Sequence, residues 1–175
     1  MLTNIAILLF ILVAGLLAFV ATKPNAFRIA RTASIAAPPE RVFTLINDIH
    51  NWTQWSPYEH IDPAMQRSYS GAASGKGAVY TWEGNKKVGS GRMEILESAP
   101  PGKVIIKLDF KAPFEAHNTA EFTVVPKGSG SEVTWAMTGA SPFMMKLVGT
   151  FMNMDNMVGG QFAEGLGNLK RVAEA

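Results

Sequence analysis

The first 22 residues carry no charged side chain, and Ile5 through Ala21 are all apolar or small. As a helix rising 1.5 Å per residue, this run is about 26 Å long, near the lower limit for crossing a bilayer. The uncharged flanking residues extend the span to residues 1–22, and Lys23-Pro24-Asn25 ends it. The pattern predicts one N-terminal transmembrane helix.

A cleaved signal peptide is the alternative interpretation of this segment. No Lys or Arg precedes the apolar run, and cleavage after Ala21 would place Phe19 where a small residue is required. A buried core helix fits less well, because the run has no polar face.

Lys23, Arg28 and Arg31 follow the segment, so the positive-inside tendency predicts a single-pass protein with its soluble domain in the cytoplasm.

After the apolar segment, the hydrophobic pattern has first the period of a strand and then the period of a helix. Residues 23–27 are predicted to be a short linker, and Arg28–Ala36 alternates as a half-buried strand does. Pro38-Pro39 stops this strand, and Pro39 suits the first turn of a helix. The apolar stripe of Glu40–Asp48 predicts that helix, and a second short helical stretch is predicted around Asn51–Trp55.

From about Met65 the hydrophobic period changes from 3.6 to 2. The predicted strands, separated by turns rich in Gly, Pro or Asn, are Met65–Ser70, Gly77–Glu83, Gly89–Glu97, Lys103–Phe110, Glu115–Val125 and Glu132–Thr138. Their regular spacing favours an antiparallel meander. After Ser141-Pro142, apolar residues from Met144 to Val172 keep a 3–4 spacing, which predicts one long helix packed on the sheet. The fold class is α+β.

Several local sequences resemble the START-like (SRPBCC) superfamily, in particular its polyketide cyclase/dehydrase-like branch. They are SIAAPPERVF at Ser34–Phe43, NWTQWSP at Asn51–Pro57, GAVYTWEG at Gly77–Gly84 and GRMEI at Gly91–Ile95. The resemblance covers about residues 28–172. It implies the helix-grip fold, in which a curved antiparallel sheet wraps around a long C-terminal helix and encloses a cavity for something apolar. The superfamily includes lipid carriers, hormone binders and polyketide cyclases, so fold alone does not select one activity.

The phase of each strand and of the final helix predicts which side chains face that cavity. The predicted ligand-binding residues are Tyr80, Trp82, Met93, Ile106, Leu108, Phe110, Asn118, Phe122, Trp135, Met137, Val148, Phe151 and Met152. Apart from Asn118, each of these also fits a purely structural place in the core. Asn118 is the best candidate for a polar group that orients a ligand.

Candidates for chemistry are few. Glu83 and His117 could form a general acid–base pair, but both lie on the strand phase opposite to the cavity unless a bulge re-aims them. Four residues of one turn-rich segment match no established metal-ligand spacing, namely His50, Glu59, His60 and Asp62. The absence of cysteine excludes disulfides and thiolate chemistry. No glycine-rich nucleotide motif is present, so we expect neither a metal nor a cofactor.

The balance of charge also limits the partners. A net charge of +2 with scattered basic residues does not indicate nucleic acid, and nothing identifies a protein partner. We therefore expect an anchor at 1–22, a linker at 23–27 and a START-like domain at 28–175 that binds or carries a hydrophobic small molecule such as a lipid, quinone or polyketide-like compound. Two alternatives stay open: a cyclase or dehydratase using Asn118, Tyr80, Glu83 or His117, and a protein-interaction module whose cavity is filled by side chains.

Overall fold

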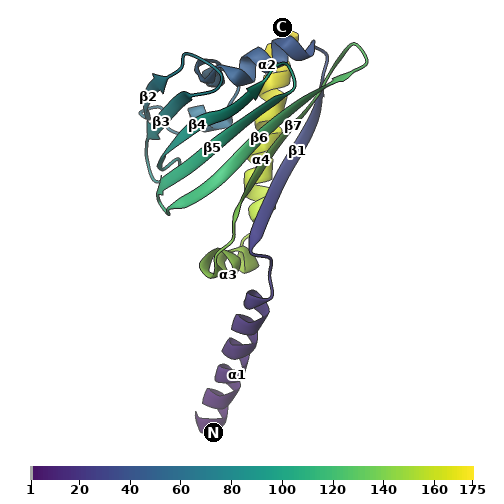
Figure 1. Cartoon of the computed structure of the whole chain (residues 1–175). Helices are drawn as coiled ribbons and strands as arrows, with labels where there is room; N and C mark the ends of the chain where they lie inside the picture. The colour runs from purple at the N-terminus through teal and green to yellow at the C-terminus, as the bar shows by residue number, and fades with distance from the viewer. Residues whose placement is uncertain (1) are drawn as a thin grey trace.

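The computed structural model describes residues 2–175, and its N-terminal helix extends away from the sheet (Figure 1). This helix, α1, spans Leu2–Ala21 and contains no acidic or basic residue in its terminal turns. Among the described residues, only the part of α1 from Thr3 to Ala21 is long and apolar enough to cross a membrane. A signal sequence would satisfy the same criterion of length and composition.

The remaining elements form one antiparallel sheet with helices at its concave side. The strands are β1 (Ala26–Ile35), β2 (Gln66–Gly71), β3 (Ala78–Glu83), β4 (Ser90–Ala99), β5 (Lys103–Ala112), β6 (Ala116–Lys127) and β7 (Gly130–Ala140). The helices are α2 (Pro39–Asn47), α3 (Phe143–Phe151), α4 (Met154–Glu174) and two short 3₁₀ helices, η1 (Ile49–Gln54) and η2 (Pro57–His60). The strand order is β1-β7-β6-β5-β4-β3-β2, so β1 crosses over to pair with the last strand.

The sheet curves around α4, which packs against β1 and also contacts β7, η1 and η2 (Figure 1). One cause of the curvature is a bulge in β4, where Ile95 pairs with Ile106 but Glu97 pairs with Ile105, so that Leu96 is an extra residue. The long helix therefore has an apolar surface to cover, as the stripe on its sequence requires. The predicted α+β helix-grip fold is confirmed.

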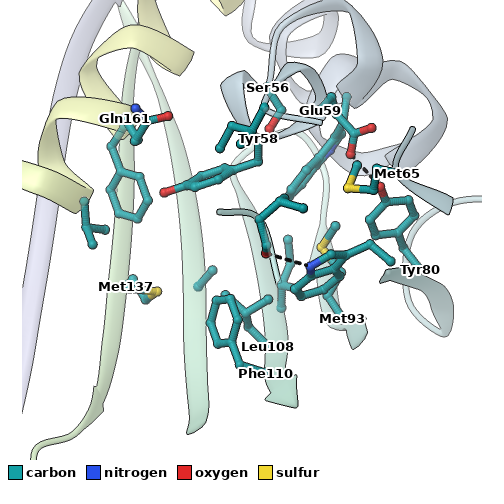
Figure 2. A pocket seen from close by; sticks show the side chains of 18 of the residues that line it. Ser56, Tyr58, Glu59, Met65, Tyr80, Met93, Leu108, Phe110, Met137 and Gln161 are labelled. Atoms are coloured by element: carbon teal, nitrogen blue, oxygen red, sulfur yellow. Dashed lines mark hydrogen bonds between the residues drawn. The ribbon is translucent and has the colours of Figure 1, made fainter. Parts of the chain in front are cut away.

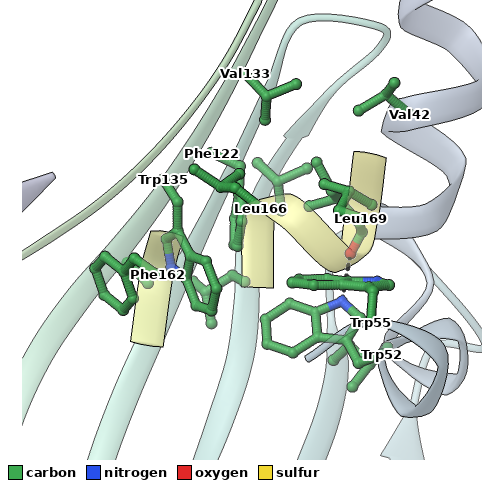
Figure 3. Packing of buried hydrophobic residues seen from close by; sticks show 14 of the residues in the cluster. Val42, Trp52, Trp55, Phe122, Val133, Trp135, Phe162, Leu166 and Leu169 are labelled. Atoms are coloured by element: carbon green, nitrogen blue, oxygen red, sulfur yellow. Dashed lines mark hydrogen bonds between the residues drawn. The ribbon is translucent and has the colours of Figure 1, made fainter. Parts of the chain in front are cut away.

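An aromatic cluster joins the sheet to α4 and to the turn after α2 (Figure 3). The indole of Trp135 on β7 stacks on Phe162 of α4, with ring centroids 4.2 Å apart, and on Phe122 of β6 at 4.9 Å. Trp55 meets Trp135 edge to face at 5.7 Å. Large buried rings contribute more to the hydrophobic free energy of folding than any other side chains, so this cluster is the centre of the core.

The tryptophan-rich turn also completes the C-terminal end of α2. The last carbonyl groups of a helix have no partner within the helix. Here the indole N–H of Trp52 donates to the carbonyl oxygen of Ile46 at 2.9 Å, and that of Trp55 donates to Leu45 at 3.1 Å. Both rings are thereby fixed in orientation while their carbon faces stay in the core.

Two glycines of α4 allow the helix to lie close to the sheet. A Cβ atom on Gly165 would stand 2.7 Å from the Trp135 ring and 3.0 Å from Pro57. A Cβ atom on Gly159 would stand 2.1 Å from the guanidinium of Arg31, which forms an ion pair with Asp155 at 2.9 Å. Packing therefore requires Gly165, despite the cost of about 1 kcal/mol of a glycine in a helix, whereas a side chain at Gly159 would displace the flexible Arg31 guanidinium.

The prediction of one continuous C-terminal helix is wrong. The helical pattern is divided into α3 and α4, with Met152 in an extended conformation between them. Asn153 is the N-cap of α4, and its side chain accepts a hydrogen bond from the backbone N–H of Asn156 at 3.0 Å. Because the apolar spacing continues through the cap, hydrophobic periodicity alone does not reveal the break. The first strand also starts at Ala26, two residues before the predicted Arg28.

Candidate functional site

A cavity of about 580 Å³ lies between the concave face of the sheet and α4. Figure 2 shows its side chains projecting from the strands, from α4 and from the segment around η2. The cavity is lined by Trp52, Ser56, Tyr58, Glu59, Ile61, Met65, Tyr80, Trp82, Lys87, Val88, Met93, Ile106, Leu108, Phe110, Ala112, Pro113, Ala120, Trp135, Met137, Met157, Val158, Gln161 and Phe162. Most of these residues are apolar, and four are methionines, whose flexible thioethers suit a surface that adapts to its ligand.

Strand phase places most of the predicted residues at this cavity. Those that line it are Tyr80, Trp82, Met93, Ile106, Leu108, Phe110, Trp135 and Met137. They come from four strands, β3, β4, β5 and β7, and share one face because residues two apart in a strand point to the same side. Their role in binding stays a prediction.

Two predicted residues of β6 lie on the concave face but do not line the cavity. Phe122 is fully buried beneath Trp135 and belongs to the core. Asn118 is half-buried near the start of the strand, where its amide contacts the Met137 sulfur at 3.8 Å. Its Oδ1 fills the space over Gly139, 2.0 Å from where a Cβ atom would be. Asn118 thus packs beside the cavity, separated from it by Met137.

Three further predicted residues lie away from the cavity, in the segment where the helix is broken. Val148 and Phe151 belong to α3, Met152 follows it, and all three side chains are exposed. The prediction that these residues line the cavity required α3 and α4 to be one straight helix. Since the chain changes direction at Asn153, the apolar face of α3 does not point at the sheet.

The proposed acid–base pair is not assembled. Glu83 is exposed at the end of β3, and His117 is exposed on the outer face of β6. The His117 Nδ1 atom lies 2.7 Å from a carboxylate oxygen of Asp109, which is its neighbour on β5. That contact and the nearby Lys107 ammonium hold the pKa of Asp109 below its usual range. The bulge in β4 does not re-aim either candidate.

A polar cluster that sequence reasoning missed closes one end of the cavity. The buried carboxylate of Glu59 accepts a hydrogen bond from the Tyr80 hydroxyl at 2.7 Å (Figure 2). It also forms an ion pair with the Arg67 Nε atom at 2.6 Å. Arg67 also donates to the carbonyl oxygens of Glu59 and Met65. Burial, together with this hydrogen bond to Glu59, raises the pKa of Tyr80. Both carboxylate oxygens already have donors, so Glu59 holds Tyr80 in place.

Tyr58 is the second polar residue that the sequence did not indicate. Its side chain extends across the cavity towards α4, the helix that carries Gln161 (Figure 2). Burial raises the pKa of its hydroxyl, which therefore stays neutral at physiological pH. Among residues 2–175, the buried side-chain polar atoms without a hydrogen-bond partner are the Ser56 Oγ and the Trp135 Nε1, which both belong to residues that line the same cavity. Tyr58 follows Pro57 in a turn-rich stretch without strand or helix periodicity, so no phase argument could assign its direction.

No group of three or more His, Asp or Glu side chains in the part of the chain that the structure describes could hold a metal ion. Of the four residues considered above, Glu59 is engaged by Arg67, and Asp62 accepts a hydrogen bond from the backbone N–H of Asn85 at 2.7 Å. The site is therefore an apolar cavity with a few polar groups inside it and the exposed Lys87 among its lining residues.

Comparison with known proteins agrees with this geometry. The profile of the family described as polyketide cyclase/dehydrase and lipid transport matches residues 26–174. The chain belongs to this family. The match spans the whole of the sheet and α4, so the START-like resemblance carried by the local motifs is confirmed. No curated protein matches the sequence.

Solved structures of polyketide cyclase-like and related proteins share the fold at low identity. The di-domain ARO/CYC BexL from the BE-7585A biosynthetic pathway aligns with a TM-score of 0.67 and 14% identity, over 89% of this chain and 52% of that one. Protein CV1439 from Chromobacterium violaceum aligns with a TM-score of 0.60 and 17% identity, over 87% and 99%. Protein Ms6760 from Mycobacterium smegmatis gives 0.60 and 19%, over 85% and 91%. These likenesses concern the fold.

Proposed function

We propose that this protein is a membrane-anchored binder or carrier of a hydrophobic small molecule, such as a lipid, a quinone or a polyketide-like compound. Residues 1–22 are the anchor, 23–27 the linker and 28–175 the ligand-binding domain. The cavity of about 580 Å³ is the observation that carries the proposal. Its volume falls within the roughly 300–1,000 Å³ typical of ligand sites, and its lining is mostly apolar.

The polar groups of the cavity limit the ligand further. Glu59 is neutralised by Arg67 and saturated by Tyr80, so it offers no free charge to a ligand. The Tyr58 hydroxyl is a neutral donor, and Gln161 is a polar residue of α4 that lines the same space. A predominantly apolar molecule with one carbonyl or hydroxyl group fits this arrangement, because the buried Ser56 hydroxyl and Trp135 indole N–H have no partner among the described residues, and a buried polar group without a partner costs free energy.

A cyclase or dehydratase is the second candidate function. The family includes polyketide cyclases and dehydrases, and BexL is a di-domain ARO/CYC protein. Such an enzyme would use the cavity to fold its substrate, with Tyr58 and Gln161 orienting a reacting carbonyl. Against it, Glu83 and His117 face outward, and the pKa of both cavity tyrosines is raised, so neither phenol is a base at neutral pH. The third alternative, a filled interaction module, fits poorly with a cavity of this volume.

The membrane location is part of the proposal. A bilayer is where apolar ligands concentrate, and α1 has the length and composition of a span. Lys23, Arg28 and Arg31 follow α1, which favours a cytoplasmic domain. Protease treatment of sealed membrane vesicles of either orientation would test this. Digestion of the domain only from the non-cytoplasmic side would show the opposite orientation.

Binding is tested on the full chain purified in mild detergent, by mass spectrometry of the solvent extract and by titration with a hydrophobic fluorophore. Ala120 lines the cavity, whereas its neighbour Thr119 faces outward on the same strand. We expect Ala120→Phe to abolish binding and Thr119→Phe to preserve it, with unchanged circular dichroism in both. If no apolar molecule is extracted and no fluorophore binds, the proposal fails.

A further inference from the structure

The short helix α3 has its apolar face turned to the outside. Met144 is 65% exposed and Phe151 72% exposed, and Val148 lies between them on the same face at helical spacing. The buried residue of this helix is instead Lys146, which is 8% exposed. No Asp, Glu or Arg occurs in Phe143–Phe151. A helix in water exposes its charged residues and buries its apolar ones. The opposite arrangement in α3 indicates an apolar environment around its outer face.

Lys146 fastens α3 to the end of the N-terminal helix. Its ammonium donates to the side-chain oxygen of Asn25 at 2.6 Å, and the backbone N–H of Ser141 donates to the Asn25 carbonyl at 2.7 Å. The helices α1 and α3 are also in contact. Only Thr22–Asn25 separate α1 from β1, a reach of about 14 Å when fully extended. Any membrane that α1 spans therefore has its surface at α3.

The mouth of the cavity lies at this same end of the domain. Its exposed lining residues are Lys87 before β4, Ala112 at the end of β5, Pro113 after it, and Met157 in the first turns of α4. Strand pairing places the β3–β4 and β5–β6 turns at the end of the sheet where β1 starts and β7 finishes. This is the end from which α1 extends (Figure 1). Phe114, in the turn between β5 and β6, is 77% exposed.

We infer that α3 lies in the surface of the bilayer that α1 spans, with Phe114 and Met157 beside it, and that the cavity opens onto this surface. A hydrophobic ligand then passes between the membrane and the cavity without crossing water. The occupant of the apolar face is the lipid surface itself, since α3 is in contact with the membrane helix and carries almost no charge. The inference rests on the proposed function, because it requires both the anchor and a ligand cavity.

The absence of cysteine makes a direct test possible, since one introduced cysteine takes one label. The variants are Met144→Cys and Phe151→Cys on α3, Phe10→Cys in the middle of α1, and Ser129→Cys in the β6–β7 turn at the opposite end of the domain. Each full-length variant, labelled with an environment-sensitive fluorophore, is reconstituted into phosphatidylcholine–phosphatidylglycerol vesicles. Brominated acyl chains quench labels in lipid, and iodide quenches labels in water.

We expect lipid quenching of the labels at Met144, Phe151 and Phe10, and iodide quenching of the label at Ser129. Iodide quenching on α3 with lipid quenching at Phe10 would overturn the inference and leave the anchor intact. Water exposure at Phe10 as well would remove the anchor, and with it the proposed function. Shielding of the α3 labels from both quenchers would show that a second copy or another protein covers this face, which also overturns the inference.

A second measurement concerns transfer of the ligand. The double variant Met144→Glu/Phe151→Glu is compared with Leu96→Glu, which places a charge on an exposed apolar residue of the β4 bulge. We expect the double variant to take up an anthroyloxy-labelled fatty acid from vesicles roughly tenfold more slowly, because it loses two apolar contacts with the interface. Its equilibrium affinity for the same fatty acid in detergent stays unchanged, as it does for Leu96→Glu. Equal uptake rates for both variants would contradict a membrane-facing mouth.

Discussion

Replacing Glu59 by Ala should destabilise the domain more than any comparable change of an acidic residue on its surface. The carboxylate is buried and accepts from Tyr80 at 2.7 Å and from Arg67 at 2.6 Å. Breaking a buried ion pair by removing one partner costs about 3–5 kcal/mol. The Arg67 side chain is 26% exposed and keeps two carbonyl acceptors, so we expect the lower end, about 3 kcal/mol.

Two further variants separate the contributions of Arg67 and Tyr80 to this loss of unfolding free energy. Glu59→Gln keeps the shape and an acceptor for Tyr80 but points an amide donor at the Arg67 guanidinium, so we expect a loss of about 1–2 kcal/mol. Tyr80→Phe removes only the hydroxyl and should cost about 1 kcal/mol in the native background. In the Glu59→Ala background the same change should cost almost nothing, because the two residues share one hydrogen bond.

The assay is urea unfolding of the full chain in nonionic detergent, followed by the fluorescence of its four tryptophans, all of which lie in the domain. Glu94→Ala is the matched control, since Glu94 pairs with Arg92 at 2.7 Å on the half-exposed outer face, where ion pairs contribute about 0–1 kcal/mol. If Glu59→Ala lowers the free energy of unfolding no more than Glu94→Ala does, the polar cluster does not hold this end of the cavity together.

Three other changes have defined outcomes. Gly165→Ala should lower the melting temperature, because its Cβ atom would stand 2.7 Å from a buried ring, whereas Gly167→Ala, with open space around it, should raise it through helix propensity. Arg31 depresses the pKa of Asp155. The stability from this pair is therefore present above the unfolded-state pKa of the carboxyl and is lost as pH falls through the lower folded-state pKa. Asp155→Asn should remove that part of the acid dependence of the free energy of unfolding, measured from pH 6 down to pH 2. Tyr58→Phe should weaken binding of a carbonyl-containing ligand by about fivefold, the effect of one hydrogen bond, and leave binding of a pure hydrocarbon unchanged in the same titration. An unchanged affinity for both ligands would show that the hydroxyl makes no contact with them.

The local periodicity of the sequence determined the elements and the face of each strand. Residues two apart in a strand must share a side, so Tyr80, Trp82, Met93 and Leu108 could be placed on the concave face without knowing the fold. The apolar run before Lys23 likewise indicated a membrane helix from composition alone. These features depend on near neighbours in the chain, which is why they could be read in sequence.

Three features were decided only by the tertiary structure. The cap at Asn153 separates α3 from α4 although the apolar spacing continues across it, so the outward face of α3 depends on how Lys146 meets Asn25. Asn118 has the correct phase but is displaced from the cavity because Gly139 leaves room for its amide on the next strand.

The polar end of the cavity is the third feature. Glu59 and Tyr58 lie in a segment with no regular period; Arg67 and Tyr80, which reach Glu59 from the sheet, set the direction of its carboxylate, and the Tyr58 ring lies edge to face with Trp135. The alternation of residues along a strand, which can be read from the sequence, shows on which face of the sheet a side chain lies. Contacts between residues far apart in the chain determine whether that side is core, cavity or membrane, because the free energy of burial depends on what packs there.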